Sequence, residues 1–404
     1  MQIKVFQAAP PILKLNAKRV TKIRVLHVIT TLGRGGAERQ LVNLVNNTTP
    51  GEFEHLICYL HPPGDFESEL KQAGHEVVCM DLPRRAPWLF APLSLKPILK
   101  RFRPNVVQTW LYEADFAVRL SVPRKSIPIV NTLHMPTYEP ETIAAGRWPN
   151  WKMQTLRQID RTTARWAKPL FIAVSDTVRR SAVKQLGVPP GDVRIIYNSI
   201  DLETLKSSSG ASEKLRADLG IPSDGFVFLN VARLAPQKGQ AQLLDAFHLV
   251  ALQNSNTYLV FAGDGPLRKE LEALADSLGV SERVRFLGRR EDVGTCLELG
   301  DAFVFPSLFE GLPLAPVEAM LKGLPCIATK IGSLEEIITN RENGILVPLG
   351  AVTELAQAMT EICKDKELRN SLASRAQMLA YQRFERHHGL MSWENLYREV
   401  ATTN

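Results

Sequence analysis

Short apolar runs alternate with segments of helical periodicity along most of the chain. Residues 23–30 (IRVLHVIT) are apolar and rich in β-branched side chains, as in a strand buried on both faces, and residues 37–47 follow with an amphipathic helical pattern. Similar apolar runs, with helical patterns between them, occur at residues 55–60, 76–80, 106–109, 127–133 and 170–174. This alternation predicts a parallel sheet that is covered by helices on both faces.

The strand pattern pauses in the polar stretch that follows Asp201 and restarts at residues 226–231 (FVFLNV). The second half then repeats the alternation, with strands expected at 258–262, 284–287, 301–306, 325–329 and 345–347. We therefore predict an α/β protein with two doubly wound, Rossmann-like parallel-sheet domains that face each other across a cleft. The expected units are a flexible N-terminal arm (1–22), a first domain (23–205), a second domain (206–385) and a C-terminal helix (386–404) that packs back on the first domain.

Composition agrees with two domains, since 404 residues with 45% hydrophobic content exceed what one ordinary domain needs. The net charge of +7 is divided unevenly. Residues 1–205 hold 28 Lys and Arg against 17 Asp and Glu, or +11, and the remainder holds 21 against 25, or −4. A basic half favours an acidic partner such as nucleic acid, an anionic membrane surface or a phosphorylated acceptor.

Cysteine spacing and hydropathy indicate a cellular compartment. The five cysteines show no CxxC spacing and most lie in apolar runs, which is typical of buried reduced thiols rather than of disulfides or a metal site. No run of 18 apolar residues predicts a membrane span, and residues 1–22 lack the uninterrupted apolar core of a signal peptide. We expect a cytoplasmic protein.

Residues 309–318 (FEGLPLAPVE) are the most informative stretch, because they place Glu310 and Glu318 eight positions apart. Pro313 and Pro316 exclude one continuous helix across the stretch. We expect Glu310 on a loop at the carboxyl end of a strand, and a helix that begins at Pro316 with Glu318 in its first turn. A loop carboxylate beside a helix start can hold a polyhydroxylated, phosphorylated ligand. The alternative is a solvated Glu310 and a Glu318 that complements the helix dipole.

Two further motifs in the second half follow predicted strands. VARLAPQKGQ places the cations Arg233 and Lys238 five positions apart, which suits a clamp for a diphosphate. FAGDGP is a sharp turn in which Gly263 and Gly265 would let a nucleotide base or ribose lie against the backbone. For each cation alone, solvation at the surface is the alternative.

The first half offers candidates for the opposite wall of the cleft. Gly35 and Gly36 follow the first strand and allow close approach of a ligand, and an ordinary tight turn is the alternative. The turn is not the GxGxxG fingerprint, so a nicotinamide or flavin enzyme is disfavoured. His134 ends the strand IVNTLH and could reach the cleft, or it could be a hydrogen-bonded filler.

Together these motifs resemble the retaining, nucleotide-sugar-dependent glycosyltransferases of family 4, which have the GT-B fold. The resemblance extends over nearly the whole chain from about residue 23. It rests on GGAE (35–38), IYNSID (196–201), VARLAPQKG (231–239), AGDGP (262–266) and FEGLPLAPVEA (309–319). One departure is Ser199, where the family often has a glycine before the interdomain linker.

The resemblance implies a role for each matching residue. Arg233 and Lys238 would bind the donor diphosphate and stabilise the departing nucleotide. Glu310 and His134 would contact the donor sugar, and Glu318 would accept hydrogen bonds from the ribose. The remaining donor-binding positions implied are Gly35, Gly36, Gly263, Gly265, Gly311, Leu312, Pro313 and Leu314. The NDP-sugar would be a co-substrate, with no other cofactor and no metal.

The implied activity is retaining transfer of a hexose or N-acetylhexosamine from an NDP-sugar, UDP more often than GDP. The acceptor would be a glycan or a lipid-linked sugar in the synthesis of cell-surface polysaccharide, lipopolysaccharide or glycolipid. The alternatives are a sugar-nucleotide epimerase of the same fold and a non-catalytic protein that binds nucleotide sugar or nucleic acid. Nucleic acid is disfavoured as a partner, because the aromatic residues are not interleaved with cations on a recognisable sheet platform.

Two basic segments, 84–103 and 147–168, suggest peripheral attachment to an anionic inner membrane surface. In the second segment, Trp148, Trp151 and Trp166 accompany several arginines and lysines at helical spacing, a combination that suits a headgroup interface. The alternative is that the tryptophans belong to the core and the arginines are solvated.

Overall fold

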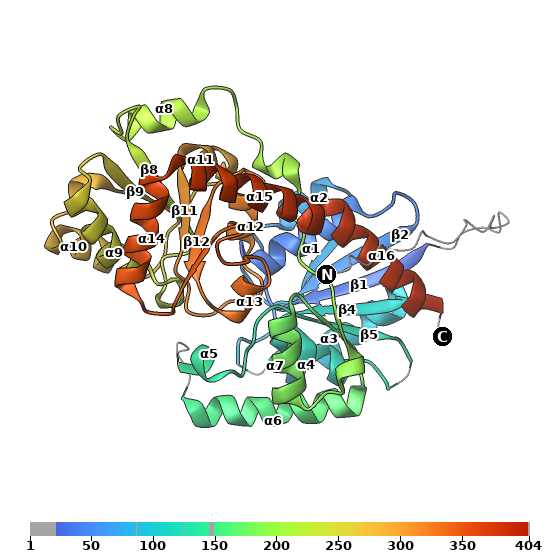
Figure 1. The fold of residues 1–404 in the computed structure, drawn as a ribbon. Coiled ribbons are helices and arrows are strands. Elements are labelled where there is room, and N and C mark those ends of the chain that lie inside the picture. Colours follow the sequence, from blue (N-terminus) through green and yellow to red (C-terminus); the bar gives the residue numbers. More distant parts are fainter. Residues whose placement is uncertain (1–21, 86, 125, 145–148, 403–404) are drawn as a thin grey trace, which may run out of the picture.

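The protein consists of two parallel β-sheets with helices on both faces of each (Figure 1). The computed structural model describes residues 22–85, 87–124, 126–144 and 149–402, so that residues 1–21 of the expected N-terminal arm lie outside it. The predicted fold class, two doubly wound Rossmann-like domains, is confirmed.

The first sheet has seven parallel strands in the order β3-β2-β1-β4-β5-β6-β7. Its strands are β1 (Ile23–Ile29), β2 (Phe53–Tyr59), β3 (Glu76–Cys79), β4 (Val106–Trp110), β5 (Ile129–Leu133), β6 (Leu170–Ala173) and β7 (Val193–Ile195). The helices of this half are α1 (Gly36–Asn47), α2 (Glu67–Gln72), α3 (Pro87–Phe102), α4 (Tyr112–Ser121), α5 (Pro140–Ala144), α6 (Asn150–Ala167) and α7 (Asp176–Leu186).

The second sheet has six parallel strands in the order β10-β9-β8-β11-β12-β13. Its strands are β8 (Phe226–Val231), β9 (Thr257–Ala262), β10 (Val284–Phe286), β11 (Ala302–Phe305), β12 (Cys326–Thr329) and β13 (Ile345–Val347). The helices are α8 (Ala211–Asp218), α9 (Gln240–Gln253), α10 (Arg268–Ser277), α11 (Val293–Leu299), α12 (Leu314–Leu321), α13 (Gly332–Glu335), α14 (Val352–Lys364), α15 (Lys366–Phe384) and α16 (Arg386–Thr402).

Strand β1 shows why most positions of the strands are apolar. Val25 and Ile29 point into one hydrophobic cluster, which they share with α1 and α16, whereas Leu26 and Val28 point into another with α3 and α4. Each fully buried aliphatic side chain stabilises the fold by roughly 1.5–3 kcal/mol. Because both faces are covered, an alternating polar pattern would be unfavourable here.

The chain crosses between the domains twice, and the two crossings lie side by side. Ile200 donates its amide to the carbonyl of Phe384 at 2.8 Å, close to the point where α15 ends and α16 begins. Helix α16 then lies along the first domain (Figure 1). Its Trp393 and Tyr397 belong to the core there, and the Tyr397 hydroxyl donates to the side chain of Gln108. Gln40 holds the linker by exchanging two hydrogen bonds with the backbone of Ser199, at 2.8 and 3.0 Å.

The start of α12 differs from our prediction. The helix begins at Leu314 with Pro313 as its N-cap residue, so Pro316 is the third helical residue and Glu318 lies in the second turn. A proline is tolerated at that position because its missing N–H would have no partner within the helix. The helix ends at Leu321, and Gly323 adopts a φ of +75° just beyond it.

Candidate active site

Two large cavities lie where the two domains face each other. The first, of about 570 Å³, is lined by the start of α1 and by α12, and we call it the α1–α12 cavity. The second, of about 460 Å³, is lined by the end of β5 (132–135), by α7 and by Gln237 and Phe309 of the second domain, and we call it the β5–α7 cavity. The two share no lining residue.

Lys238 and Glu310 form an ion pair. Gln237 and Phe309, which precede them in the sequence, line the β5–α7 cavity. The Lys238 ammonium lies 2.5 Å from Oε1 of Glu310 and 5.2 Å from the ring centroid of Phe305. Lys238 ends a 3-10 turn after β8, and Glu310 lies on the loop after β11. The two meet because β8 and β11 are neighbours in the sheet. Glu310 is only 6% exposed, so it is not a solvated loop residue.

The two loops of this ion pair are locked together by their backbones. Gln237 donates from its side-chain amide to the carbonyl of Phe309, and its own carbonyl accepts from the amide of Leu308, both at 2.8 Å. Gly239 has a φ of +66°, and a Cβ there would overlap the carbonyl of Pro306. Only glycine therefore lets the Lys238 turn approach the end of β11 so closely. Sequence reasoning missed Gln237, since a glutamine in a turn carries no distinctive signal.

Arg233, the second expected cation, is exposed and stands apart from the ion pair. Its guanidinium makes no hydrogen bond or ion pair with any described residue, and its carbonyl accepts a hydrogen bond from Gln240 at 3.0 Å. In the structure, the Arg233 side chain is therefore not part of the ion pair that holds Lys238. The joint action of the two cations on a diphosphate stays a prediction.

Gly263 and Gly265 lie beside the Arg233 turn. A Cβ at Gly263 would overlap the carbonyl of Ala232, and one at Gly265 would overlap that of Leu234. These glycines thus allow two turns of the protein itself to pack together, which explains their identity without a ligand. That they also contact a nucleotide stays a prediction.

His134 lies at the end of β5, directly across from the Glu310 loop. A Cβ at Gly311 would overlap the His134 carbonyl, and Ser175 donates its hydroxyl to the Gly311 carbonyl at 2.7 Å. The imidazole stacks on Trp110 with the ring centroids 5.3 Å apart, and its Nε2 has no hydrogen-bond partner among the described residues. Burial lowers the pKa of His134 to about 4, so the ring is neutral at physiological pH.

The start of α1 meets the start of α12. Gly35 is the N-cap residue of α1, and the position of a Cβ at Gly36 lies 3.6 Å from the side chain of Leu314. Leu314 therefore packs against the glycine turn of the first domain. Leu312 is buried, and its carbonyl lies 3.5 Å from the side-chain amide of Asn198.

Glu318 projects into the α1–α12 cavity from the second turn of α12. Burial raises the pKa of its carboxyl to about 7, and the opposing influence of Arg39 is smaller. Arg39 is itself paired with Glu69 at 3.1 Å. Arg34, Arg289 and Arg290 also line this cavity, and Arg34 forms an ion pair with Glu291 across the domains. The arginine pair that follows β10 was the available sequence signal for this wall.

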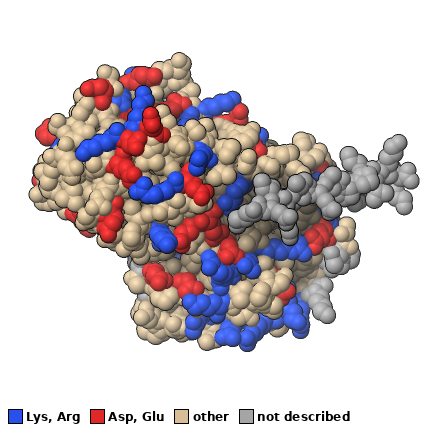
Figure 2. All heavy atoms as spheres, viewed as in Figure 1, with Lys and Arg blue, Asp and Glu red and all other residues tan. Residues whose placement is uncertain are grey.

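The basic segments of the first domain are at its surface, and Lys and Arg side chains gather along the lower edge of the domain (Figure 2). Trp151 and Trp166 of α6 are 71% and 45% exposed, so they are not core residues. On α3, Leu89 and Leu93 are 65% and 78% exposed. Arg147 and Trp148 of the expected segment lie outside the described residues.

The described residues form neither a metal site nor a membrane-spanning helix. Within the described ranges, no group of three or more His, Cys, Asp or Glu side chains is arranged to hold a metal ion. No helix in the same part of the chain has the length and apolar character needed to cross a membrane. All five cysteines are free thiols.

Two family models match the chain, one for each domain. The model described as Glycosyltransferase Family 4 matches residues 34–204, and the model described as Glycosyl transferases group 1 matches residues 211–378.

Individual proteins match over most of the chain. The UDP-Gal:alpha-D-GlcNAc-diphosphoundecaprenol alpha-1,3-galactosyltransferase of Escherichia coli is 27% identical over 287 residues, which are 68% of this chain and 70% of that protein. The lipopolysaccharide core biosynthesis glycosyltransferase LpsD of Rhizobium meliloti (strain 1021) is 28% identical over 84% of this chain and 88% of its own length. The crystal structure of Anabaena Alr3699/HepE in complex with UDP and glucose superimposes with a TM-score of 0.80 at 26% identity, covering 92% of this chain and 98% of that one.

Proposed function

This chain belongs to glycosyltransferase family 4 and has the GT-B fold, and we propose that it transfers a hexose or N-acetylhexosamine from a UDP-sugar, with retention, to a glycan or lipid-linked acceptor. The acceptor would belong to the synthesis of cell-surface polysaccharide, lipopolysaccharide or glycolipid. The observation that carries the proposal is the Lys238–Glu310 ion pair, which lies at the carboxyl ends of two neighbouring strands and faces His134 of the other domain.

The choice of UDP is supported by the relatives. HepE is described in complex with UDP and glucose, and the galactosyltransferase relative carries UDP-Gal in its name. Both align with this chain over at least two thirds of its length. The epimerase and binding-protein alternatives have less support, because the relatives of the sequence are named glycosyltransferases.

Charge governs the proposed chemistry. Breaking the bond between the anomeric carbon and the phosphate builds negative charge on the leaving nucleotide and positive charge on the sugar ring. Lys238, together with Arg233, would stabilise the negative charge on the departing diphosphate. Stabilisation of this charge would be the largest electrostatic contribution to the reaction. The leaving phosphate would accept the proton of the acceptor hydroxyl as that hydroxyl attacks the same face of the sugar.

Glu310 and His134 would position the sugar. Glu310 holds the Lys238 ammonium in place and would offset part of the charge that develops on the sugar ring. His134 is neutral and its Nε2 has no protein partner, so the ring is available for a sugar hydroxyl. His134 does not need to accept a proton, because the leaving phosphate would accept the proton of the acceptor hydroxyl.

The nucleotide would extend into the α1–α12 cavity. Glu318 would accept hydrogen bonds from the ribose hydroxyls there. Four arginines line this cavity beside five carboxyl groups, and they would supply the contacts to the phosphates of the nucleotide.

A thermal-shift panel followed by transfer assays tests this function. UDP or a UDP-sugar should raise the melting temperature at concentrations above its Kd, whereas adenosine and cytidine diphosphates should not. The retained configuration would be read from the anomeric coupling constant of the product. Isomerised donor without any transfer product would favour the epimerase instead, and absence of binding by every nucleotide sugar would reject the proposal.

We also propose that the outer surfaces of α3 and α6 rest on an anionic membrane. Exposed Trp151 and Trp166 stand among lysines and arginines on α6, a combination that binds headgroups through both apolar insertion and charge. Sedimentation with phosphatidylglycerol vesicles should carry the protein down at low salt and release it at high salt. Trp151→Ala should weaken binding, and Tyr381→Ala, an exposed aromatic on α15, is the matched control. No sedimentation at low salt would exclude the surface.

A further inference from the structure

The β5–α7 cavity adjoins the proposed reaction centre and shares no lining residue with the α1–α12 cavity. It is lined by Gln237 and Phe309, which directly precede Lys238 and Glu310. Glu310 itself lines a third cavity of about 230 Å³ that shares Phe309 and Thr142 with the β5–α7 cavity. A molecule in the β5–α7 cavity would therefore end close to the ion pair.

The α1–α12 cavity is lined by four arginines together with five carboxyl groups, whereas the charged groups that line the β5–α7 cavity are all acidic. The carboxyl groups of Glu113, Asp115 and Asp160 line it, and no described Lys or Arg does. Arg119 is fully buried behind the wall, 2.5 Å from Asp160 and 4.0 Å from Asp115. Among the described residues, this guanidinium forms no ion pair with Glu113, which lies 3.8 Å from His61 instead. The wall is therefore negative when Glu113 and Asp160 are both ionised and His61 is neutral.

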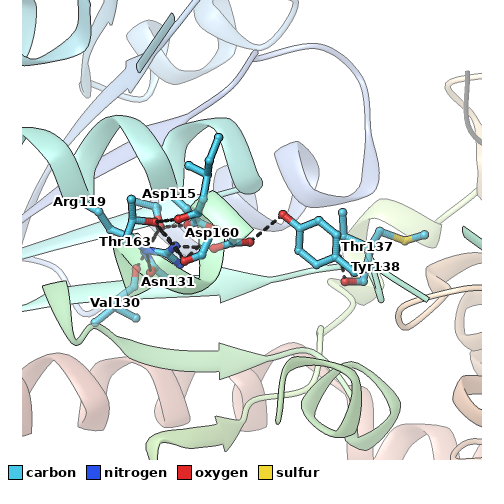
Figure 3. A network of polar contacts seen from close by, with 11 residues as sticks. Asp115, Arg119, Val130, Asn131, Thr137, Tyr138, Asp160 and Thr163 are labelled. Carbon is cyan, nitrogen blue, oxygen red and sulfur yellow. Dashed lines mark hydrogen bonds and ion pairs between the residues drawn. The ribbon is translucent and has the colours of Figure 1, made fainter. Parts of the chain in front are cut away.

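A hydrogen-bond network fixes this wall (Figure 3). Arg119 donates to Asn131 at 2.8 Å, and Tyr138 reaches from the loop after β5 to donate its hydroxyl to Asp160 at 2.9 Å. Asp115 accepts a hydrogen bond from Thr109. The carboxylates of Asp115 and Asp160 are held by partners on several elements, and they cannot turn without breaking those bonds. Glu113 lies outside this network and accepts a hydrogen bond from Tyr112 at 3.3 Å.

The rest of the lining combines polar groups with an apolar surface. The hydroxyls of Thr30 and Thr142 have no hydrogen-bond partner among the residues that the structure describes. On the α7 side, Val178 and Leu186 form an apolar surface. A pyranose presents the matching combination, because its ring faces are apolar and its rim carries hydroxyls.

We propose that the β5–α7 cavity binds the terminal sugar of the acceptor as an uncharged, hydroxyl-bearing pyranose and rejects a terminal sugar that bears a phosphate or carboxylate. This inference rests on the proposed function. Glu113 accepts a hydrogen bond from an acceptor hydroxyl, and charge-assisted hydrogen bonds of this kind are strong. An anionic substituent in the same place meets like charges, and their repulsion disfavours binding.

Binding measurements with UDP-loaded protein test the inference without requiring turnover. The probes are matched pairs of alkyl glycosides, each as the neutral hexoside, its 6-phosphate and its uronic acid, with calorimetry as the readout. The neutral member should bind at least about tenfold more tightly than either anion, the minimum expected for a like charge inside a cavity.

Substitutions within the cavity assign the effect to it. In Glu113→Gln, the ratio of the Kd of the anionic glycoside to that of the neutral glycoside should fall by about tenfold. Thr142→Val should weaken binding of the neutral glycoside. Neither substitution should change the affinity for UDP. Glu54→Gln, an exposed carboxylate on β2, is the control. An anionic glycoside that binds as well as its neutral partner, an unchanged preference in Glu113→Gln, or no binding by any neutral glycoside would overturn the inference. Failure to bind UDP would instead reject the proposed function.

Discussion

The carboxylate of Glu336, in the second domain, caps the amino end of helix α7 in the first domain at Thr177. One of its oxygens accepts hydrogen bonds from both the amide and the hydroxyl of Thr177 at 2.7 Å, and the other accepts from the amide of Asp176 at 2.8 Å. A negative charge at a helix start is favourable because unpaired amides point toward it. The α7 wall of the β5–α7 cavity is thus tied to the opposite domain.

Removal of this cap should loosen the interface. We expect Glu336→Ala to lower the free energy of unfolding by about 1–2 kcal/mol, the usual cost of a lost N-cap. Glu335→Ala, an exposed neighbour, should change it by less than about 0.5 kcal/mol. Urea denaturation followed by tryptophan fluorescence measures both, and equal effects of the two substitutions would show that the cap contributes nothing.

The Lys238–Glu310 pair should be essential for turnover. Lys238→Ala and Glu310→Ala should each reduce kcat by about two orders of magnitude or more, the size expected for a lost electrostatic contact at a transition state. Lys269→Ala, an exposed lysine at the start of α10, should retain normal activity. Circular dichroism should confirm folding, since each substitution leaves its partner charge unpaired. Near-normal kcat in either variant would refute the assignment.

Glu318 should make stability depend on pH. Burial raises the pKa of this carboxyl from 4.5 to about 7, so the folded protein holds a proton that the unfolded chain releases at lower pH. Ionisation of Glu318 therefore costs stability as the pH rises from 4.5 to 7. Glu318→Gln removes that cost, and its stability relative to the parent should rise between pH 5 and pH 8 by at most about 3 kcal/mol.

Denaturation of both proteins at several pH values tests this expectation. Burial also raises the pKa of Asp115 to about 7. Asp115 titrates in both proteins, so its contribution cancels in the difference between their free energies of unfolding. If the difference in free energy of unfolding between the two proteins stays constant from pH 5 to pH 8, Glu318 is ionised throughout that range.

The buried ion pair of Arg119 and Asp160 should dominate the stability of the first domain's helical layer. Asp160→Asn leaves a guanidinium that is fully buried, with Asp115 4.0 Å away as its remaining carboxylate, so we expect a loss of about 3–5 kcal/mol. Asp176→Asn, which breaks partly exposed pairs on α7, should cost less than about 1 kcal/mol. Thermal melts of the two variants would separate the cases, and similar melting temperatures would contradict the expectation.

Local sequence determined the elements and the loops that carry the chemistry. The mostly apolar run of β1 and the glycines before α1 predicted strand, turn and helix, because each depends on neighbouring residues alone. The same logic placed Glu310 on a loop at a strand end. It failed at the start of α12, because the prolines at 313 and 316 both fit a helix start and the neighbouring residues do not distinguish between them.

Tertiary structure decided which of these loops meet. The contact of Lys238 with Glu310 follows from the neighbouring positions of β8 and β11, and strand order is set by packing over distances that no local pattern reports. Arg119 and Asp160 are a second example. Each is a charged residue on a helix, for which the local sequence predicts a solvated side chain, but packing of the helices buries both. A pattern of residues records local preference, whereas burial and pairing of charge depend on the whole fold.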